Sequence, residues 1–140
     1  MSWQSFIDNM LAYEGVSDAV IAGCQDGRWH IWAAAKDQEL CKVTHDELSN
    51  LVSTNREQLF SNGLKLGGVK YFMLRDAMFS GEECCYVDAR EKGAESQTSP
   101  LTAAKGNTVL VIVKGKPGVH GSKANVPATN TALHLKRCNY

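Results

Sequence analysis

The chain has 140 residues, of which 44% are hydrophobic and 21% charged, and its fifteen basic and fifteen acidic residues give a formal net charge of zero. This length suits one hydrophobic core, so we expect a single domain over residues 1–140. A balanced charge creates no overall field that would attract a polyanion, so we expect no nucleic-acid partner.

The N-terminal residues predict an amphipathic helix that ends near Gly15. Ser2 can cap it, and apolar residues then recur at the spacing of one helical face, namely Trp3, Phe6, Ile7, Met10 and Leu11. Such a stripe usually packs in a core, but complete burial is difficult in the first turn of a terminal helix. Half-exposed tryptophan is enriched where proteins bind partners, so Trp3 is also a candidate contact residue.

Two β-rich runs, 18–24 and 28–35, predict a hairpin. The Asp26-Gly27 pair between them supplies the positive φ angles of a tight turn. Because side chains alternate along a strand, Trp32 shares a face with His30, and Trp29 faces the opposite way.

The middle of the chain predicts a short strand at 40–43 and then a helix. Thr44 and Glu47 stand three residues apart before Leu48 and Leu51, which is the capping-box pattern. We expect this helix to have about three turns.

The second half of the chain predicts consecutive strands at 69–79, 84–90, 101–104 and 108–114, with a polar loop at 91–100. The last run holds five successive apolar residues, which is typical of a strand covered on both faces. Since the connections are too short for crossover helices, we expect an antiparallel meander and an α+β fold.

A final helix is predicted after residue 125. Asn125 or Val126 would cap it and Pro127 would lie in its first turn. Its apolar stripe is Ala128, Ala132 and Leu135, and Lys136 and Arg137 close it at the end that favours positive charge.

Signatures of catalysis, cofactors and metals are missing from the sequence. No glycine-rich stretch has P-loop spacing, no Cys/His pair has zinc-site spacing, and the five cysteines lack CxxC spacing, so we expect reduced thiols and no cofactor or metal. No run approaches the ~20 apolar residues that span a bilayer, and we expect a cytoplasmic protein. The alternative to a binding protein is a small enzyme or ligand carrier, which would need a cleft that gathers His120, a carboxylate and a hydroxyl.

Six segments then point to a family: SWQSFIDNML, IWAAA, NGLKLGG, LRDAMF, VLVIVKGKPGVHG and HLKRCNY. In this order and spacing they resemble animal-type profilins across essentially the whole chain. The resemblance implies a central antiparallel sheet of about seven strands, with the N- and C-terminal helices on one face and smaller helices on the other. It also implies a non-enzymatic, cytoskeleton-associated protein that binds actin monomers, regulates their polymerisation and links actin to proline-rich ligands.

The resemblance further implies three sets of contact residues. The proline-rich ligand would be bound by Trp3, Phe6, Trp32, His134, Leu135 and Tyr140. Actin would be bound by Lys70, Arg75, Arg90, Lys92, His120, Gly121 and Asn125, where Arg90 and Lys92 match if the turn at 80–83 absorbs a one-residue offset. Phosphoinositide head groups would be bound weakly, and in a salt-sensitive way, by Lys70, Arg75, Arg90, Lys92, Lys136 and Arg137.

The chain also departs from the family at several of these positions. Members commonly carry Tyr where Phe6 stands, and loss of a hydroxyl donor costs about 1 kcal/mol if the ligand uses it. Animal profilins typically carry Lys, an aromatic residue and Glu where this chain has Val126, Thr129 and Asn130. We therefore expect actin to be bound more weakly than by members with the full set.

Overall fold

The computed structural model describes residues 2–81, 83–93 and 97–140, and within these ranges seven strands form one antiparallel sheet in the order β2-β1-β7-β6-β5-β4-β3. The strands are β1 (Val16–Gln25), β2 (Arg28–Ala34), β3 (Leu64–Leu66), β4 (Val69–Asp76), β5 (Cys85–Glu91), β6 (Pro100–Lys105) and β7 (Val109–Gly115). The helices are α1 (Trp3–Leu11), α2 (His45–Leu51), α3 (Arg56–Asn62) and α4 (Ser122–Arg137), with a 3₁₀ helix, η1, at Leu40–Lys42.

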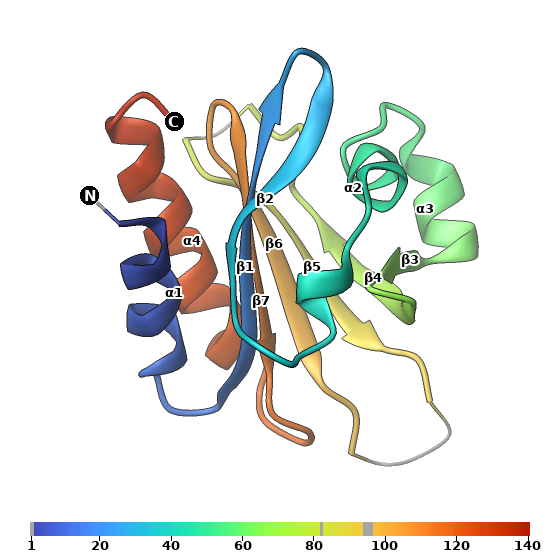
Figure 1. The fold of residues 1–140 in the computed structure, drawn as a ribbon. Helices are drawn as coiled ribbons and strands as arrows, with labels where there is room; N and C mark the ends of the chain where they lie inside the picture. Colours follow the sequence, from blue (N-terminus) through green and yellow to red (C-terminus); the bar gives the residue numbers. More distant parts are fainter. Residues whose placement is uncertain (1, 82, 94–96) are drawn as a thin grey trace.

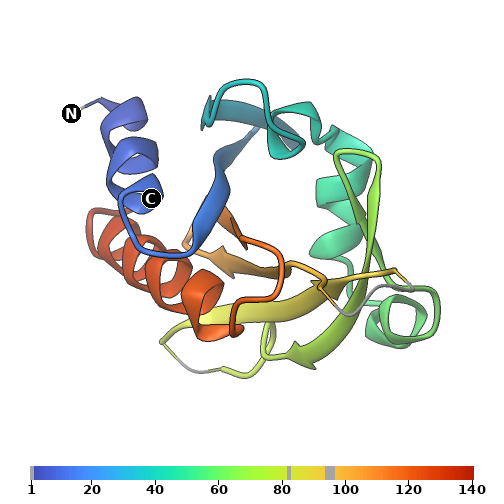
Figure 2. The same cartoon turned by 90° about the horizontal axis from the view of Figure 1, so that it is seen from below.

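The helices cover the two faces of the sheet in pairs. Helices α1 and α4 lie side by side on one face, while α2 and α3 lie on the other (Figures 1 and 2). Each pair has its own buried cluster: Ile7 and Leu135 belong to the α1–α4 cluster, and Leu48 and Leu59 belong to the α2–α3 cluster. The predicted α+β arrangement is confirmed.

Strand β7 is buried along its whole length between these two clusters. Val111 and Val113 point into the α1–α4 cluster, whereas Leu110 and Ile112 point into the α2–α3 cluster. The prediction of a strand covered on both faces is therefore confirmed, and the meander from β3 to β7 is antiparallel as expected.

The hairpin of β1 and β2 is also confirmed, and it contains a bulge that the sequence did not indicate. Asp26 and Gly27 have φ angles of 53° and 76°, as a tight turn requires. Ala33 pairs with Ile21 and Ile31 pairs with Ala22, which leaves Trp32 between them without a partner on β1. Trp32 packs on the α1–α4 cluster and Trp29 on the α2–α3 cluster, so the two rings face opposite ways.

Two predictions for residues 40–62 are wrong. Residues 40–42 form η1 instead of a strand, because the Leu40 N–H donates to the Asp18 carboxylate at 2.9 Å and the Lys42 N–H donates to the Glu39 carbonyl. The capping box of Thr44 is present, but α2 has seven residues and is shorter than predicted. A separate helix, α3, follows, and the side chain of Asn55 caps it by accepting from the Gln58 N–H.

Two further boundaries differ from the prediction. Strand β4 ends at Asp76, because the Asp76 carboxylate binds Arg56 and accepts the Met78 N–H, which turns the chain away from the sheet. Helix α4 begins at Ser122, and the Asn125 N–H already donates to the Gly121 carbonyl. Pro127 therefore lies inside the helix, where it has no N–H to donate to the carbonyl one turn earlier.

Asp18 gives a prediction for the pH dependence of stability. Its buried carboxylate accepts the N–H groups of Ala19 and Leu40, yet burial outweighs these bonds and raises its pKa from 3.8 to about 6. Because the folded state holds this proton more tightly than the unfolded state, the contribution of Asp18 to stability declines as the pH rises from about 4 to about 6. We expect the free energy of unfolding, taken relative to Asp18→Asn, to fall by about 2 kcal/mol across that window. Urea denaturation of both proteins at pH 4 and pH 7 measures it, and a constant difference would contradict it.

Candidate functional site

Five aromatic side chains from both ends of the chain and from β2 meet at one end of the α1–α4 face. The ring of Trp3 lies 4.8 Å from Trp32, 4.9 Å from Tyr140 and 6.0 Å from Phe6, measured between centroids. The Phe6 ring lies 5.8 Å from His134. We call Trp3, Phe6, Trp32, His134 and Tyr140 the aromatic cluster, and Trp3 is at its centre.

Backbone geometry positions the members of this cluster. The bulge directs Trp32 over Gly23, where a Cβ atom would lie only 1.9 Å from the indole ring. Tyr140 is tied down by its own N–H, which donates to the Leu135 carbonyl at 2.9 Å, and by its carbonyl, which accepts the N–H and hydroxyl of Thr108. The absence of a side chain at Gly23 is thus a requirement for the cluster.

The cluster combines apolar faces with accessible polar groups. Trp3, Phe6 and Trp32 are half-buried, and His134 and Tyr140 are exposed. Across residues 2–81, 83–93 and 97–140, the indole N–H groups of Trp3 and Trp32 make no hydrogen bond, so both donors remain for a ligand. Leu135 is completely buried beneath the rings and supports them from the α1–α4 cluster.

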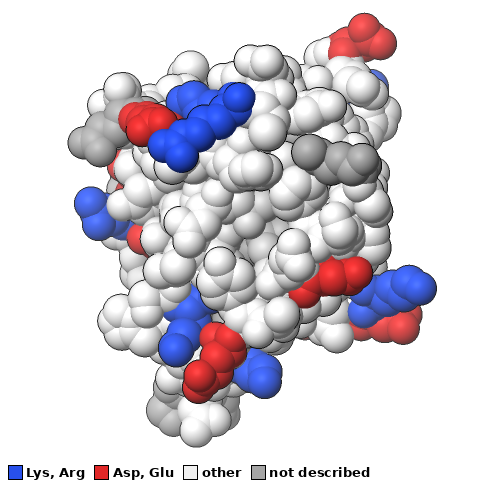
Figure 3. Space-filling view, turned by 90° about the vertical axis from the view of Figure 1, so that its left-hand side faces the viewer, with Lys and Arg blue, Asp and Glu red and all other residues white. Residues whose placement is uncertain are grey.

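Charged side chains are sparse on this face. Figure 3 shows the α1–α4 side as mostly uncharged, with Lys and Arg mainly near its edges. At one edge Lys136 Nζ donates to the Glu83 carbonyl at 2.9 Å, and Arg137 forms an exposed salt bridge with Glu83 at 3.2 Å. These two residues of the predicted phosphoinositide set therefore already contact Glu83, which lies just before β5.

A cavity lies beside the start of α4, on the face of β4, β5 and β6 that carries Leu74, Asp88 and Thr102. We call this face the outer face. This cavity, of about 470 Å³, brings together much of the predicted actin set, namely Arg75, Arg90, His120, Gly121 and Asn125. Lys70 and Lys92 lie outside it and next to one another, joined by a hydrogen bond from the Lys92 N–H to the Lys70 carbonyl at 2.9 Å.

The cations on this outer face differ in how freely they can contact a partner. Arg90 donates to the Thr98 carbonyl at 2.6 Å and to the Val119 carbonyl at 3.0 Å. Lys92 donates to the Asn62 carbonyl and lies over the Phe72 ring. Arg75 is exposed and stacks on the Tyr86 ring, and Lys70 is exposed on β4.

The cavity tests the alternative of a catalytic cleft at His120. It contains a carboxylate, Asp88, and a hydroxyl, Ser122, as that alternative requires. The Ser122 hydroxyl lies 3.0 Å from His120 Nδ1, which also accepts the Ser122 N–H, but Asp88 accepts from Thr102 at 2.7 Å and from Asn125 at 2.9 Å instead of from His120. The carboxylate does not orient the imidazole, so these groups form no catalytic relay, and the enzyme alternative is not favoured.

Sequence reasoning missed the apolar part of this outer face. Phe72 and Leu74 are 53% and 61% exposed on β4, and Val126 is 45% exposed on α4. Since Tyr71 and Met73 on the opposite face of β4 are buried, this strand is apolar on both sides. That pattern was visible in the sequence and indicates a surface that a partner covers.

Within the part of the chain that is described, no helix is long and apolar enough to cross a membrane. The same residues contain no group of three or more His, Cys, Asp or Glu side chains that would hold a metal ion.

Known proteins resemble the chain over its full length. The Profilin family model matches residues 1–140. Human Profilin-1 is 34% identical over 139 residues, which cover 99% of this chain and 98% of that protein, and rat Profilin-2 is 33% identical over 135 residues, which cover 96% and 95%. Among solved structures, mouse Profilin IIa in complex with a double repeat from the FH1 domain of mDia1 is similar with a TM-score of 0.92 at 32% identity, covering 100% of both chains. Rat profilin 2a is similar with a TM-score of 0.90 at 32% identity, covering 99% of this chain and 96% of that one.

Proposed function

The chain belongs to the profilin family, and on that premise we propose that it binds actin monomers, regulates their polymerisation and delivers them to proline-rich partners. The aromatic cluster is the observation that carries this proposal. We further propose that residues 1–140 act as one profilin-like domain without catalytic activity, in the cytoplasm and in association with the actin cytoskeleton.

The chemistry of the aromatic cluster fits a proline-rich segment. Polyproline II is already extended, so it loses little conformational entropy on docking. The tilted rings of Trp3 and Trp32 offer apolar faces on which prolyl rings can pack, and their indole N–H groups can donate to the exposed carbonyls of the ligand. A solved profilin structure that this chain resembles holds a repeat from an FH1 domain. At Phe6 the chain offers no hydroxyl donor, and it relies on the indoles instead.

For actin we propose the outer face of β4 and β5 together with the start of α4. Exposed Phe72 and Leu74 supply apolar anchors, and Arg75, His120 and Asn125 supply a polar rim. This composition matches protein interfaces, in which a few central apolar residues carry most of the energy. Because Arg90 and Lys92 are held by internal carbonyls, they shape this face more than they attract a partner.

We expect the start of α4 to limit actin affinity. The triple substitution Val126→Lys, Thr129→Tyr and Asn130→Glu restores the residue types typical of the family and should tighten actin-monomer binding about tenfold. The added ring would supply an anchor worth ~2 kcal/mol, part of which is lost in ordering the new side chains. Titration of labelled actin monomers with both proteins measures the change.

The control for this prediction keeps the charges and omits the ring. Val126→Lys with Asn130→Glu should change the association rate more than the affinity, because rim charges mainly steer encounter. An affinity for actin that stays equal or falls in the triple variant would show that the binding energy lies elsewhere on this face.

Few basic side chains on these faces are available to a lipid head group. Lys70 and Arg75 are exposed, although Arg75 also stacks on Tyr86. Arg90, Lys92, Lys136 and Arg137 each donate a hydrogen bond to another group of the protein. Only clustered basic residues hold a protein at an anionic surface, at about 1 kcal/mol each. We therefore propose weak, salt-sensitive contact with phosphoinositide head groups.

Gly23→Ala should disturb the aromatic cluster without touching the ligand itself. A Cβ atom at this position overlaps the Trp32 ring, so the ring must move and change its packing against Trp3. We expect binding of a proline decamer to weaken about tenfold, with a change in intrinsic tryptophan emission before any ligand is added. Isothermal titration measures the affinity. Gly121→Ala, where a Cβ atom meets nothing within 4 Å, serves as the control. An unchanged affinity in Gly23→Ala would show that Trp32 can move without loss.

The proposed function as a whole is tested by retention on polyproline resin. The protein should bind the resin, and actin monomers should co-elute with it from a purified mixture. Failure to bind the resin would contradict the assignment of the aromatic cluster, and binding without actin would contradict the assignment of the outer face.

A further inference from the structure

A cavity of about 270 Å³ opens between α2, α3 and β3, and the functions proposed above do not use it. It lies on the α2–α3 side of the sheet, whereas the aromatic cluster lies on the α1–α4 side (Figure 1). We call this cavity the α2–α3 pocket.

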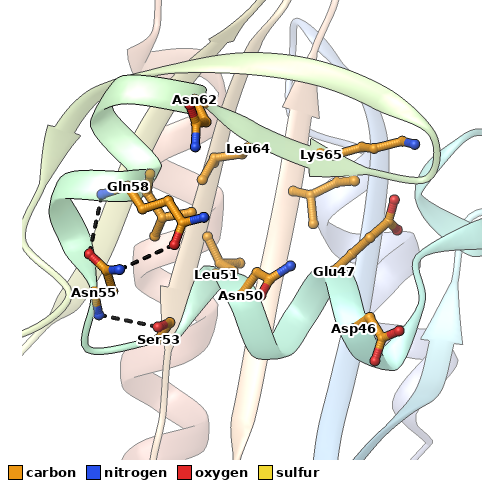
Figure 4. Close-up of a pocket in the computed structure, with 13 residues that line it drawn as sticks. Asp46, Glu47, Asn50, Leu51, Ser53, Asn55, Gln58, Asn62, Leu64 and Lys65 are labelled. Atoms are coloured by element: carbon orange, nitrogen blue, oxygen red, sulfur yellow. Dashed lines mark hydrogen bonds between the residues drawn. The ribbon is translucent and has the colours of Figure 1, made fainter.

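The floor of the α2–α3 pocket is aliphatic. Leu51 from α2 and Leu64 from β3 face one another across it (Figure 4), and Leu59 and Leu66 complete the floor. The described lining contains no aromatic ring, so it lacks the flat faces on which prolyl rings stack. An aliphatic side chain is the group that this floor fits, and the volume accommodates one such side chain with its neighbouring peptide groups.

The rim of the pocket is formed by side-chain amides. Asn55 and Gln58 bond to one another at 3.2 Å. Among the described residues, Asn50 and Asn62 make no side-chain hydrogen bond, although both line the pocket. Each amide offers both a donor and an acceptor, which is what a peptide group requires. The rim thus suits the donors and acceptors of an extended peptide backbone, and it does not suit a hydrocarbon.

Charge at the pocket favours a basic ligand. Asp46 and Glu47 line it on α2, against one cation, Lys65. Glu47 is committed to the N–H groups of Thr44, Gly67 and Gly68. Asp46 is exposed and, in the described ranges, has no hydrogen bond or ion pair, so its carboxylate remains for a cation on the ligand.

We propose that the α2–α3 pocket binds an extended peptide segment of a protein partner, with one aliphatic side chain on the leucine floor and an adjacent basic residue near Asp46. The amides of Asn50 and Asn62 hold the peptide backbone. The partner would occupy the side of the molecule opposite the aromatic cluster, so a proline-rich ligand and this partner can be bound at the same time.

The test uses three capped dipeptides and the free chain of residues 1–140. N-acetyl-Leu-Lys-amide, N-acetyl-Leu-Glu-amide and N-acetyl-Ser-Lys-amide are titrated while backbone amide shifts are followed by NMR. We expect Leu-Lys to bind with a dissociation constant on the order of a millimolar, about fivefold more tightly than Leu-Glu and about tenfold more tightly than Ser-Lys. The shifts should fall on the lining residues.

Asp46→Asn and Glu57→Gln form a matched pair of variants. Both acids lie in the first turn of a short helix and both are exposed, but Glu57 does not line the pocket. The preference for Leu-Lys over Leu-Glu should drop to about twofold in Asp46→Asn and stay near about fivefold in Glu57→Gln. Leu-Lys should bind equally well when a proline decamer saturates the aromatic cluster.

Four outcomes would overturn the inference: no saturable shifts up to about 20 mM peptide, equal affinity for the three dipeptides, equal effects of the two variants, or shifts confined to the aromatic cluster. Each is independent of polyproline and actin binding, so a failure here leaves the proposed function untouched. Loss of resin binding would likewise leave this inference standing.

Discussion

Replacing Trp3 with alanine is expected to weaken the binding of a proline-rich peptide by about 30- to 1000-fold. The Trp3 ring contacts Phe6, Trp32 and Tyr140, so its loss opens the centre of the aromatic cluster and removes one free indole donor. A central aromatic anchor is typically worth ~2–4 kcal/mol at an interface. Isothermal titration with a proline decamer measures the loss.

The same variant should bind actin monomers with nearly unchanged affinity, because the proposed actin face is formed by β4, β5 and the start of α4. Trp29→Phe is the matched control, since Trp29 lies on the same hairpin and packs on the opposite side of the sheet. We expect that control to keep its affinity for the decamer. Loss of both actin and proline binding in Trp3→Ala, with an intact circular dichroism spectrum, would refute separate surfaces.

Replacing Arg56 with alanine is expected to lower the free energy of unfolding by about 2 kcal/mol, because its ion pair with Asp76 is partly buried and so falls between an exposed pair and a fully buried one. Arg56 forms two hydrogen bonds with Asp76, at 2.7 and 2.9 Å, and also donates to the Leu51 and Ser53 carbonyls. One side chain thus joins the end of α2, the start of α3 and the end of β4. Urea denaturation measures the loss.

Two comparisons make this prediction specific to a partly buried, hydrogen-bonded pair. Arg137→Ala breaks an exposed salt bridge with Glu83 and should cost at most about 1 kcal/mol.

Burial alone would raise the pKa of Asp76, but hydrogen bonds from Arg56 and the Met78 N–H outweigh it and hold that pKa below 3.8. The stability that Asp76 contributes is therefore lost as the pH falls through its folded-state pKa, and the effect of Arg56→Ala should shrink in acid. Equal costs for Arg56→Ala and Arg137→Ala would contradict the prediction.

Elements with a local signal could be predicted from the sequence. The stripe of α1, the Asp26-Gly27 turn, the capping box of Thr44 and the apolar run of β7 each depend on neighbouring residues, and all are present. Residues 40–42 could not be predicted in this way, because the Leu40 N–H finds its acceptor in Asp18, which is distant in sequence. The start of α4 was mispredicted for a related reason, because Pro127 was expected in the first turn. Pro127 is buried in the interior of α4, where tertiary packing outweighs its poor helix propensity.

The candidate site was predictable to a different degree. The aromatic residues lie between positions 3 and 140, so only the resemblance to a family could group them, and the structure brings them together. Neither the bulge at Trp32 nor the close approach of its ring to Gly23 has a sequence signal, because both depend on pairing with β1. Exposed Phe72 and Leu74 did have a sequence signal, because β4 carries apolar residues on both of its faces.

Strand β7 has a consequence for how the molecule opens. Val111 and Leu110 are neighbours on one strand but belong to opposite clusters. Unfolding of the helices and strands around one cluster would therefore expose the other cluster to solvent. The chain should therefore unfold cooperatively, with the amide hydrogens of β7 exchanging with solvent only through global opening. A destabilising substitution beneath α2 and α3 would then reduce the population competent to bind ligands on the far side, without altering the affinity of each folded molecule.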